Sequence, residues 1–425
     1  MRLRKTITTI VATAILLAGW QLFAVIANQP ELIPSLPRLV RTLCEWLVSG
    51  SFYQSVGATI LRGILGMSIS FVCAIGMAGL FARFEWVYEL FRPLLAIMRS
   101  IPVISFILLA LIFLNPESIP LMIAFLTMFP LLTENLTRGI LDLRPGLSIM
   151  ARQFHIRRSN VLFQIIYPQL KPFLYSGLAS AAGFGWRAII MGEVLSQCAF
   201  GIGSEMKRAQ NFIAVPELLA WTIVAVFISF FFDKGISKVT DITPKISFAN
   251  EDQTIPTPTL SVLDTKDISY QYGIQHFSHS FQKGIIYGIS APSGKGKTTL
   301  LNLIGGILLP TEGEIHPTRH FGIATIFQQP QLLPYLTAEE NIILPLSSFL
   351  TEEKARRIAQ KHSQEMEMEP FGNRYPKELS YGQQQRIAIA RALASPSPLL
   401  LMDEPFKGLD EALSHRIIER IREKQ

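Results

Sequence analysis

Long apolar runs separated by short polar segments dominate the first half of the chain. Residues 7–27 carry no charged side chain over 21 positions, and residues 63–82 carry none over 20 positions. With a rise of about 1.5 Å per residue, a helix of this length crosses a hydrocarbon core of about 30 Å. Four weaker runs, each of which contains or borders a charge or a proline, follow at 90–114, 118–136, 172–195 and 215–232. The pattern predicts an all-α polytopic membrane domain of about six helices over residues 1–239.

The pattern changes after residue 239. Residues 240–260 are polar, contain isolated Thr-Pro pairs and lack an apolar period, which predicts an extended linker. From residue 261 to 425, short apolar runs alternate with amphipathic segments. This second half therefore reads as an α/β domain.

The charge is divided unevenly between these halves. Residues 1–240 contain 20 Lys+Arg against 11 Asp+Glu, a net charge of +9, whereas residues 241–425 contain 19 against 21, a net charge of −2. The basic excess lies in the apolar half, so it indicates membrane topology and argues against nucleic-acid binding. With six spans and the N-terminus inside, twelve Lys and Arg residues lie inside and four outside.

Two further features of the sequence concern processing and cysteine chemistry. The basic segment 1–5 precedes the first apolar run, but Ala24 and Ala27 do not form an Ala-x-Ala cleavage site, so we expect a retained signal anchor. Cys44, Cys73 and Cys198 have no ligand-like spacing. They are predicted to be buried thiols without a metal or a disulfide.

The clearest chemical motif is a glycine-rich loop between an apolar run and a helix. The run 285–290 predicts a strand, and residues 300–304 continue a predicted helix. A loop in this context cradles phosphate groups with its backbone N–H groups and the helix N-terminus. The loop consists of Ala291, Pro292, Ser293, Gly294, Lys295, Gly296, Lys297, Thr298 and Thr299.

Two more segments carry the chemistry of a nucleotide site. The apolar run 399–402 predicts a buried strand that ends in Asp403 and Glu404. The segment Ser380-Tyr381-Gly382-Gln383 precedes a predicted helix, so a hydroxyl, backbone N–H groups and a helix N-terminus come together as donors for a phosphate.

These motifs together resemble the ATP-binding domain of ATP-binding cassette (ABC) transporters. The resemblance implies that Tyr272 stacks on adenine (with Tyr270 as a rival), that Lys297 neutralises phosphate oxygens, and that Thr298, Gln328 and Asp403 hold Mg²⁺. It implies that Gln328 also touches the attacking water and that Glu404 orients or deprotonates it. Ser380 to Gln383 would contact ATP bound by a second copy, and Asp410 would lie in the loop that crosses this dimer interface. Tyr381 stands where the signature has a glycine, and its ring is expected to crowd the nucleotide.

The first half resembles the permeases of the nitrate, sulfonate and taurine importers. The resemblance rests on Leu36-Pro37, on the segment 99–102 and on the segment 129–135. It implies import of a small anion or a vitamin precursor with a separate extracytoplasmic binding protein. It also implies a multi-pass location in a bacterial cytoplasmic membrane and a homodimer.

A basic segment with helical apolar spacing lies between the fourth and fifth runs. Met150, Phe154, Val161, Leu162 and Ile165 predict one amphipathic helix within residues 147–172. The segment resembles the EAA coupling loop of importer permeases, which docks on the ATPase. In this chain Ile149 replaces the glutamate of that loop and His155 replaces its glycine. The alternative is an interfacial helix on anionic lipid.

Several ionisable residues fall inside or at the ends of the predicted spans. They are expected to form structural pairs or to snorkel, and Glu193 is the best candidate for a further role. These residues are Arg62, Arg99, Glu134, Arg187, Glu193 and Asp233.

The resemblance also implies a histidine on a strand beyond Asp410, and residues 411–425 hold only His415, which comes too early. We therefore expect a C-terminally truncated ATP-binding domain that lacks its last strands, with slow or absent hydrolysis. An exporter and a non-transporting ATP-binding remnant remain as alternatives to the importer.

Overall fold

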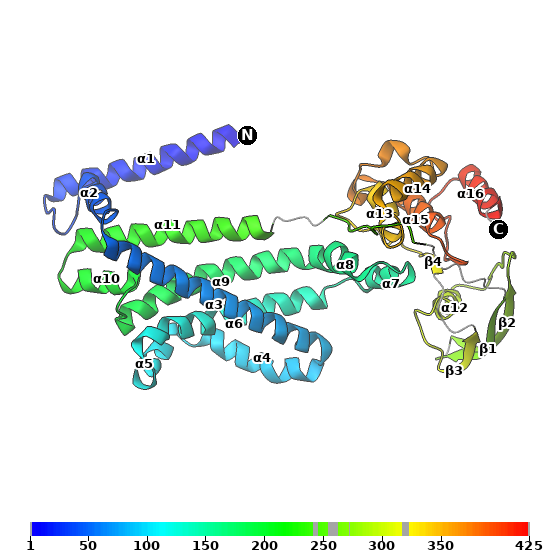
Figure 1. The fold of residues 1–425 in the computed structure, drawn as a ribbon, viewed down its shortest axis with the longest axis horizontal. Helices are drawn as coiled ribbons and strands as arrows, with labels where there is room; N and C mark the ends of the chain where they lie inside the picture. Colours follow the sequence, from blue (N-terminus) through cyan, green and yellow to red (C-terminus); the bar gives the residue numbers. More distant parts are fainter. Residues whose placement is uncertain (1, 241–244, 254–261, 272, 317–322, 424–425) are drawn as a thin grey trace. The chain divides into compact units, whose positions relative to one another are not determined.

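The computed structural model describes residues 2–240, 245–253, 262–271, 273–316 and 323–423. It divides into two compact units (Figure 1), of which the first comprises residues 1–143 and 170–242. The second unit comprises residues 144–169 and 243–425, so the segment between the fourth and fifth apolar runs groups with the C-terminal part of the chain.

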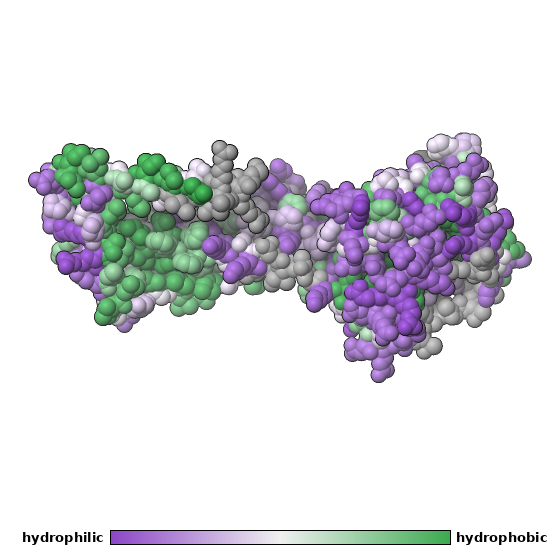
Figure 2. Space-filling view, turned by 90° about the horizontal axis from the view of Figure 1, so that it is seen from above, coloured by the Kyte–Doolittle hydropathy of each residue, from purple (hydrophilic) through white to green (hydrophobic). Residues whose placement is uncertain are grey.

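The first unit consists of helices. They are α1 (Arg2–Ala27), α2 (Leu36–Trp46), α3 (Gly50–Arg83), α4 (Glu85–Ser100), α5 (Val103–Phe113), η1 (Pro116–Ser118), α6 (Ile119–Leu141), α9 (Tyr167–Ser196), α10 (Ile202–Asn211) and α11 (Val215–Thr240). Figure 2 shows hydrophobic side chains over much of the visible face of this unit and mainly hydrophilic ones over the second unit. The unit is thus a membrane-type helical domain.

Four helices among the described residues are long and apolar enough to cross a membrane, and a bent pair adds a fifth. The run expected at 90–114 is this bent pair, in which α4 and α5 meet at an angle of 94°. Pro102 causes the break, since it lacks an N–H group and disfavours helical geometry at Ile101, which is extended with ψ 130°. The first run appears as a shorter apolar helix over Val11–Ala27.

Small residues bring α3 and α6 together. Gly66, Ala74 and Ala78 of α3 are buried, as is Ala124 of α6. A Cβ atom built on Gly66 would lie 2.7 Å from Cβ of Ala124, which is closer than two carbon atoms can approach. The two helices therefore pack with their backbones close together, as small residues allow in membrane bundles.

The second unit holds two small sheets. Strands β1 (Val262–Tyr270), β2 (Ile274–Gln282) and β3 (Glu312–His316) form an antiparallel sheet of order β2-β1-β3. Strands β4 (Ile323–Ile326) and β5 (Leu399–Met402) pair in parallel. The expected strand at 285–290 is wrong: this extended segment joins neither sheet, and the side chains of Ile285 and Ile286 are about half exposed.

Helices complete the second unit and supply most of its core. They are α7 (Pro145–Gln153), α8 (Arg158–Asn160), the π-helical η2 (Val161–Ile166), α12 (Lys297–Ile304), α13 (Ala338–Leu346), α14 (Glu352–Glu365), η3 (Glu369–Phe371), η4 (Pro376–Glu378), α15 (Tyr381–Ala394) and α16 (Glu411–Glu423). A capping box of Thr337 and Glu340 starts α13. One continuous apolar core joins α13, α14, α15 and α16 with residues of α7 and η2.

The cysteine prediction holds for one residue of three. Cys198 is buried, but Cys44 and Cys73 are exposed on the surface of the helical unit. All three are free thiols.

The α3–α6 contact predicts a sharp difference between two glycines of one helix. Gly66→Ala should destabilise the protein by about 1–3 kcal/mol, because the added methyl group overlaps Ala124. Gly76→Ala is the matched control, since a Cβ atom there meets nothing within 4 Å. Thermal unfolding in detergent measures both, and equal unfolding temperatures for the two variants would contradict the packing described.

Candidate functional site

The glycine-rich loop has the backbone geometry of an anion-binding turn. Gly294 and Gly296 have φ angles of +80° and +84°, a region that side chains disfavour. Gly296 also has no room for a side chain, since a Cβ atom would lie 2.9 Å from the carbonyl oxygen of Gly273. The loop ends at the N-terminus of α12, where backbone N–H groups and the helix dipole favour the binding of a phosphate.

Lys297 is the first residue of α12, and its amine turns back over the loop. Its Nζ atom donates to the carbonyl oxygens of Ala291 at 2.6 Å and of Pro292 at 3.2 Å. Both acceptors are neutral, so phosphate oxygens would be stronger partners for the same ammonium group. Ala291, the first residue of the loop, has a negative φ and therefore carries its methyl group without backbone strain.

The next residue forms one half of a candidate magnesium site. Thr298 donates its hydroxyl to Oδ2 of Asp403 at 2.8 Å. Both side chains, together with Gln328, line a cavity of about 260 Å³. A hydroxyl, a carboxylate and an amide oxygen are hard ligands of the kind Mg²⁺ takes, with water completing its coordination, so these residues fit the ion.

Gln328 and Glu404 meet at the ends of the parallel strand pair. The register pairs Ile326 with Met402, so the residues that follow β4 and β5 emerge at one edge. The Nε2 atom of Gln328 donates to Oε2 of Glu404 at 3.1 Å, and Nζ of Lys407 lies 3.4 Å from the same oxygen. These two hydrogen bonds, that from Gln328 first, hold the pKa of Glu404 below its usual value.

The segment before α15 has the form of a helix cap. The hydroxyl of Ser380 accepts from the N–H group of Gln383, and the Gln383 side chain accepts from the N–H group of Ser380. Tyr381 and Gly382 follow at the start of α15. Asp410 caps α16 in the same way, since its carboxylate accepts from the N–H group of Leu413 at 2.8 Å.

One candidate lies outside the described residues. This residue is Tyr272, the expected adenine contact, so its role stays a prediction. Its rival Tyr270 ends β1 and packs against the apolar core formed by β1 and α12.

The coupling segment is two helical pieces and not the single helix expected. The first piece ends after Gln153, and His155 turns the chain with a φ of +50°, the left-handed conformation that glycine takes most easily. Met150, Phe154 and Ile165 are buried in the core of the second unit, as expected, but Leu162 is 50% exposed. The expectation for Leu162 is wrong, because the break rotates the following residues relative to the first piece.

Polar side chains of this segment reach deep into the second unit. Asn160 donates to Oγ of Ser347 and to the carbonyl oxygen of Ser247 and accepts from the N–H group of Ser247, each at 2.8 Å. Gln153 donates to the carbonyl oxygen of Gly305, just after α12, at 2.6 Å. The sequence analysis missed Gln153 and Asn160, because it followed the spacing of the apolar residues. The one signal in the sequence that could have indicated these contacts is that both residues are polar and lie next to the apolar positions of the segment.

A buried arginine supports the same contact from the other side. Arg391 of α15 lies 5.3 Å from the ring centroid of Phe154 and donates to the carbonyl oxygens of Pro330 and Gln331. Burial lowers the pKa of Arg391 to about 9, so the group stays charged at neutral pH. The coupling segment is thus tied both to α12 and to the loop after Gln328.

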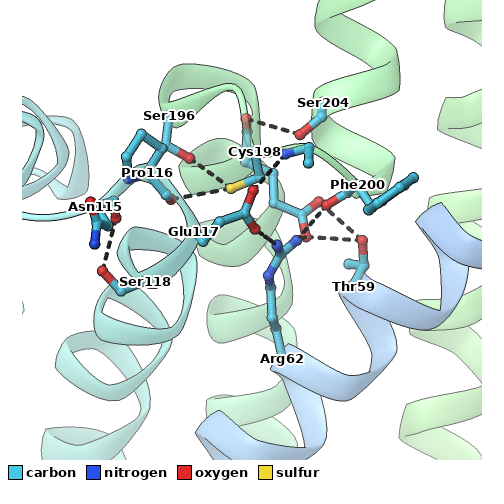
Figure 3. A network of polar contacts seen from close by, with 12 residues as sticks. Thr59, Arg62, Asn115, Pro116, Glu117, Ser118, Ser196, Cys198, Phe200 and Ser204 are labelled. Atoms are coloured by element: carbon cyan, nitrogen blue, oxygen red, sulfur yellow. Dashed lines mark hydrogen bonds and ion pairs between the residues drawn. The ribbon is translucent and has the colours of Figure 1, made fainter.

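The helical unit contains a second polar cluster, drawn in Figure 3. The buried carboxylate of Glu193 accepts from Nη1 of Arg62 at 2.7 Å, from Thr59 at 3.0 Å and from the N–H group of Gly203 at 2.9 Å. The Nη2 atom of Arg62 donates to Oε2 of Glu117 at 2.6 Å. Each charge is paired, which is the condition for placing ionised groups inside such a unit.

The remaining intramembrane charges follow the same rule where the structure shows a partner. Arg99 and Arg138 both pair with Glu134. The Arg99–Glu134 pair joins α4 to α6, and the Arg138–Glu134 pair lies within α6. Both support the structural interpretation of Arg99 and Glu134.

Comparison with known proteins matches both halves. Residues 54–233 match the family "Binding-protein-dependent transport system inner membrane component", and residues 274–407 match the family "ABC transporter". The uncharacterized ABC transporter ATP-binding protein MJ0796 of Methanocaldococcus jannaschii is 36% identical over 171 residues, which cover 36% of this chain and 73% of that protein. The thiamine import ATP-binding protein ThiQ of Yersinia pseudotuberculosis is 36% identical over 174 residues, which cover 38% of this chain and 73% of that protein.

Other relatives match over a smaller part of their length. The glucose import ATP-binding protein GlcV of Saccharolobus solfataricus is 38% identical over 146 residues, which cover 31% of this chain and 41% of that protein. The chain likewise covers 46% of the spermidine/putrescine import ATP-binding protein PotA of Nitrosomonas europaea.

A P-loop fold joined to an apolar helical unit defines a membrane-associated nucleotide-binding protein. With these relatives, the chain belongs to the ABC transporter family. It joins a permease component of the binding-protein-dependent type to an ATP-binding component, the arrangement of ABC importers.

The position of the Lys297 amine predicts a specific loss of nucleotide binding. Lys297→Ala should weaken ATP binding about 10- to 100-fold, because a charge-assisted contact to phosphate is lost. Titration of the full-length protein with a fluorescent ATP analogue measures the affinity. Lys295→Ala, which removes an exposed lysine of the same loop, is the control, and an equal loss in both variants would contradict the assignment.

The hydrogen bonds of Asn160 predict that the coupling segment loosens when they are removed. Asn160→Ala removes the hydrogen bonds of Asn160 to the backbone of Ser247 and to the buried hydroxyl of Ser347, at a cost of about 0.5–1.5 kcal/mol for each bond. Amide hydrogen exchange in residues 338–350 should therefore accelerate. Leu162→Ala, at an exposed neighbouring position, is the control and should leave exchange unchanged. Unchanged exchange in Asn160→Ala as well would show that the contact does not stabilise the segment.

Proposed function

We propose that this chain is one half of an ATP-driven importer of the cytoplasmic membrane. Two copies would pair about a twofold axis, with two permease parts and two composite ATP sites. The observation that carries the proposal is the union, in one chain, of a permease match over residues 54–233 with an ABC transporter match over residues 274–407. The docking of residues 144–169 within the ATP-binding unit supports mechanical coupling between them.

The ATP site would work through the residues of the second unit. Lys297 and the N-terminus of α12 bind the phosphates, and Thr298, Asp403 and Gln328 hold Mg²⁺, which neutralises charge on the phosphate oxygens. Glu404 orients the attacking water and accepts its proton. Ser380, Gly382 and Gln383 present a hydroxyl, N–H groups and a helix N-terminus to the ATP bound by the other copy, and Asp410 lies in the crossing loop.

The permease resemblance extends the proposal to its cargo and partner. A separate extracytoplasmic binding protein would deliver a small solute, either a nitrate-, sulfonate- or taurine-like anion or a vitamin precursor. Relatives of the ATP-binding part are named for thiamine, polyamines and glucose, so this part carries no preference among solutes. The excess of Lys and Arg on one side of the spans supports a multi-pass topology with the ATP-binding part in the cytoplasm.

The proposal predicts hydrolysis that depends on one carboxylate. In lipid nanodiscs the full-length chain should hydrolyse ATP slowly, since the expected histidine is absent from residues 411–425. Glu404→Gln should lower that rate further, by about 10²- to 10⁴-fold, because the group that accepts the proton of water is lost. Binding of the ATP analogue should persist, since the phosphate contacts remain. Glu353→Gln, at an exposed position in α14, is the control and should hydrolyse ATP like the unchanged chain.

Two outcomes would contradict the proposal. One is a chain that binds no ATP, and the other is hydrolysis that survives Glu404→Gln. Coupling to the binding protein is tested with the same nanodiscs. A binding protein loaded with nitrate, taurine or a vitamin precursor should stimulate hydrolysis by the unchanged chain and not by Glu404→Gln.

A further inference from the structure

The segment that connects the two halves of the chain lies on the surface of the second unit where the structure describes it. Residues 245–250 form neither helix nor strand. Ile246 and Phe248 pack, partly buried, on the apolar core that α13, α14 and α15 share, whereas Ser247 between them is exposed. This alternation is the pattern of an extended chain that places one face on a surface.

The backbone of this segment is bound by the loop between α13 and α14. The N–H group of Ala249, a buried residue, donates to the carbonyl oxygen of Ser347 at 3.0 Å. The N–H group of Gln253 donates to the carbonyl oxygen of Phe349 at 2.9 Å. These two hydrogen bonds fix both the direction and the position of the segment along the loop.

A carboxylate anchors the end of the segment. Oδ1 of Asp252 accepts from the N–H group of Thr351 at 3.0 Å and from its hydroxyl at 3.1 Å, and Oδ2 accepts from Nζ of Lys354 at 3.2 Å. Thr351 directly precedes α14, so the negative charge of Asp252 lies at a helix N-terminus, where the helix dipole stabilises it.

The coupling segment binds the same connecting residues. The side-chain amide of Asn160 donates to the carbonyl oxygen of Ser247 and accepts from its N–H group, each at 2.8 Å. A neighbouring antiparallel strand would give an extended residue the same two hydrogen bonds. Nη1 of Arg157 donates to the carbonyl oxygen of Phe248 at 3.4 Å. Residues 245–253 are thus hydrogen-bonded to the coupling segment as well as to the loop after α13.

Three pieces of the chain therefore meet at one place. Asn160 also donates to Oγ of Ser347, the residue whose carbonyl oxygen accepts from Ala249. A free linker would only keep the two halves near each other, by raising their effective concentration. A hydrogen-bonded segment also fixes the orientation of the coupling segment on the helices that follow.

We propose that residues 245–253 are a strap that positions the coupling segment on the ATP-binding part. Movement of α13 and α14 would then carry the strap and the coupling segment together. The inference rests on the proposed function and deepens it, because it names a segment through which the ATP-binding part would move the permease part.

The first experiment removes a backbone donor of the strap and leaves the coupling segment unchanged. Ser247→Pro deletes the N–H group that Asn160 accepts from and places a ring carbon against the same oxygen. Amide hydrogen exchange of the full-length protein should accelerate about 2- to 10-fold in residues 154–166, the effect of one hydrogen bond. Ser247→Ala keeps the N–H group at this exposed position and is the matched control, in which exchange should stay unchanged.

The second experiment acts at the other end of the strap. Asp252→Ala removes the bonds to Thr351 and Lys354, and none of the described hydrogen bonds of Asp252 reaches the coupling segment. Exchange in residues 154–166 should nevertheless accelerate, because the strap is held less firmly. Glu251→Ala, at the exposed neighbouring position, is the control and should change nothing. Acceleration confined to residues 349–354 would show that Asp252 acts only on α14 and would overturn the positioning role.

The third experiment measures coupling in nanodiscs. The binding protein loaded with taurine should stimulate ATP hydrolysis less in Ser247→Pro than in Ser247→Ala. The basal rate and the affinity for the fluorescent ATP analogue should be equal in the two variants, since no described hydrogen bond of the strap involves the nucleotide site.

The outcomes separate this inference from the proposed function. Equal exchange in Ser247→Pro and Ser247→Ala overturns the strap, and accelerated exchange with full stimulation overturns its part in coupling. An unchanged chain that binds no ATP, or that no loaded binding protein stimulates, overturns the proposed function instead. The exchange measurements still decide whether the strap positions the coupling segment, because they need neither ATP nor a binding protein.

Discussion

The nucleotide site depends on the parallel pairing of β4 with β5. Parallel strands bring their carboxyl ends to one edge, so Gln328 after β4 meets Asp403 and Glu404 after β5. The N–H group of Asp403 extends the ladder by donating to the carbonyl oxygen of Ile326 at 3.0 Å, which fixes the level at which the two acids leave the sheet. Thr298 of α12 then reaches Asp403 from the glycine-rich loop. A slip of one residue in this register would turn Glu404 away from Gln328.

The coupling segment and the signature segment both converge on this edge. Gln153 holds the end of α12, and Arg391 connects Phe154 to the carbonyl oxygens of the loop that follows Gln328. Tyr381 holds the beginning of that loop from the start of α15. The loop after β4 therefore accepts hydrogen bonds at both of its ends. In the proposed dimer, the elements that donate them would face different partners, so a contiguous set of contacts would connect the permease, the nucleotide and the second copy.

The helical unit solves a different physical problem, which is how to keep charge in an apolar environment. Glu193 is completely buried, yet it accepts hydrogen bonds from an arginine, a hydroxyl and a backbone N–H group. A side chain on Gly201 would overlap this carboxylate, and one on Gly203 would overlap the carbonyl oxygen of Ile190 and Cβ of Glu193. The cluster joins α3, α9 and the start of α10, so the cost of burying Glu193 is offset by hydrogen bonds that also hold three helices together.

The sequence alone predicts the short-range features of the nucleotide site, and it does not predict the contacts between distant segments. Glycines at Gly294 and Gly296, the acids after an apolar run and the cap at Ser380 are short-range signals, because backbone conformation and helix capping act over a few residues. The short range of these signals also explains the two errors. Local spacing predicts a strand at 285–290, but a strand forms only where a partner strand pairs with it. Local spacing likewise predicts a single helix at 147–172, but the turn at His155 divides it. Tertiary structure alone decided that Asn160 reaches Ser347, that Arg62 pairs with Glu193 and that Tyr381 bonds to Gln328. These contacts join residues 53 to 187 positions apart. A polar side chain can be recognised in the sequence, but its hydrogen-bond partner cannot, because only folding brings the two together.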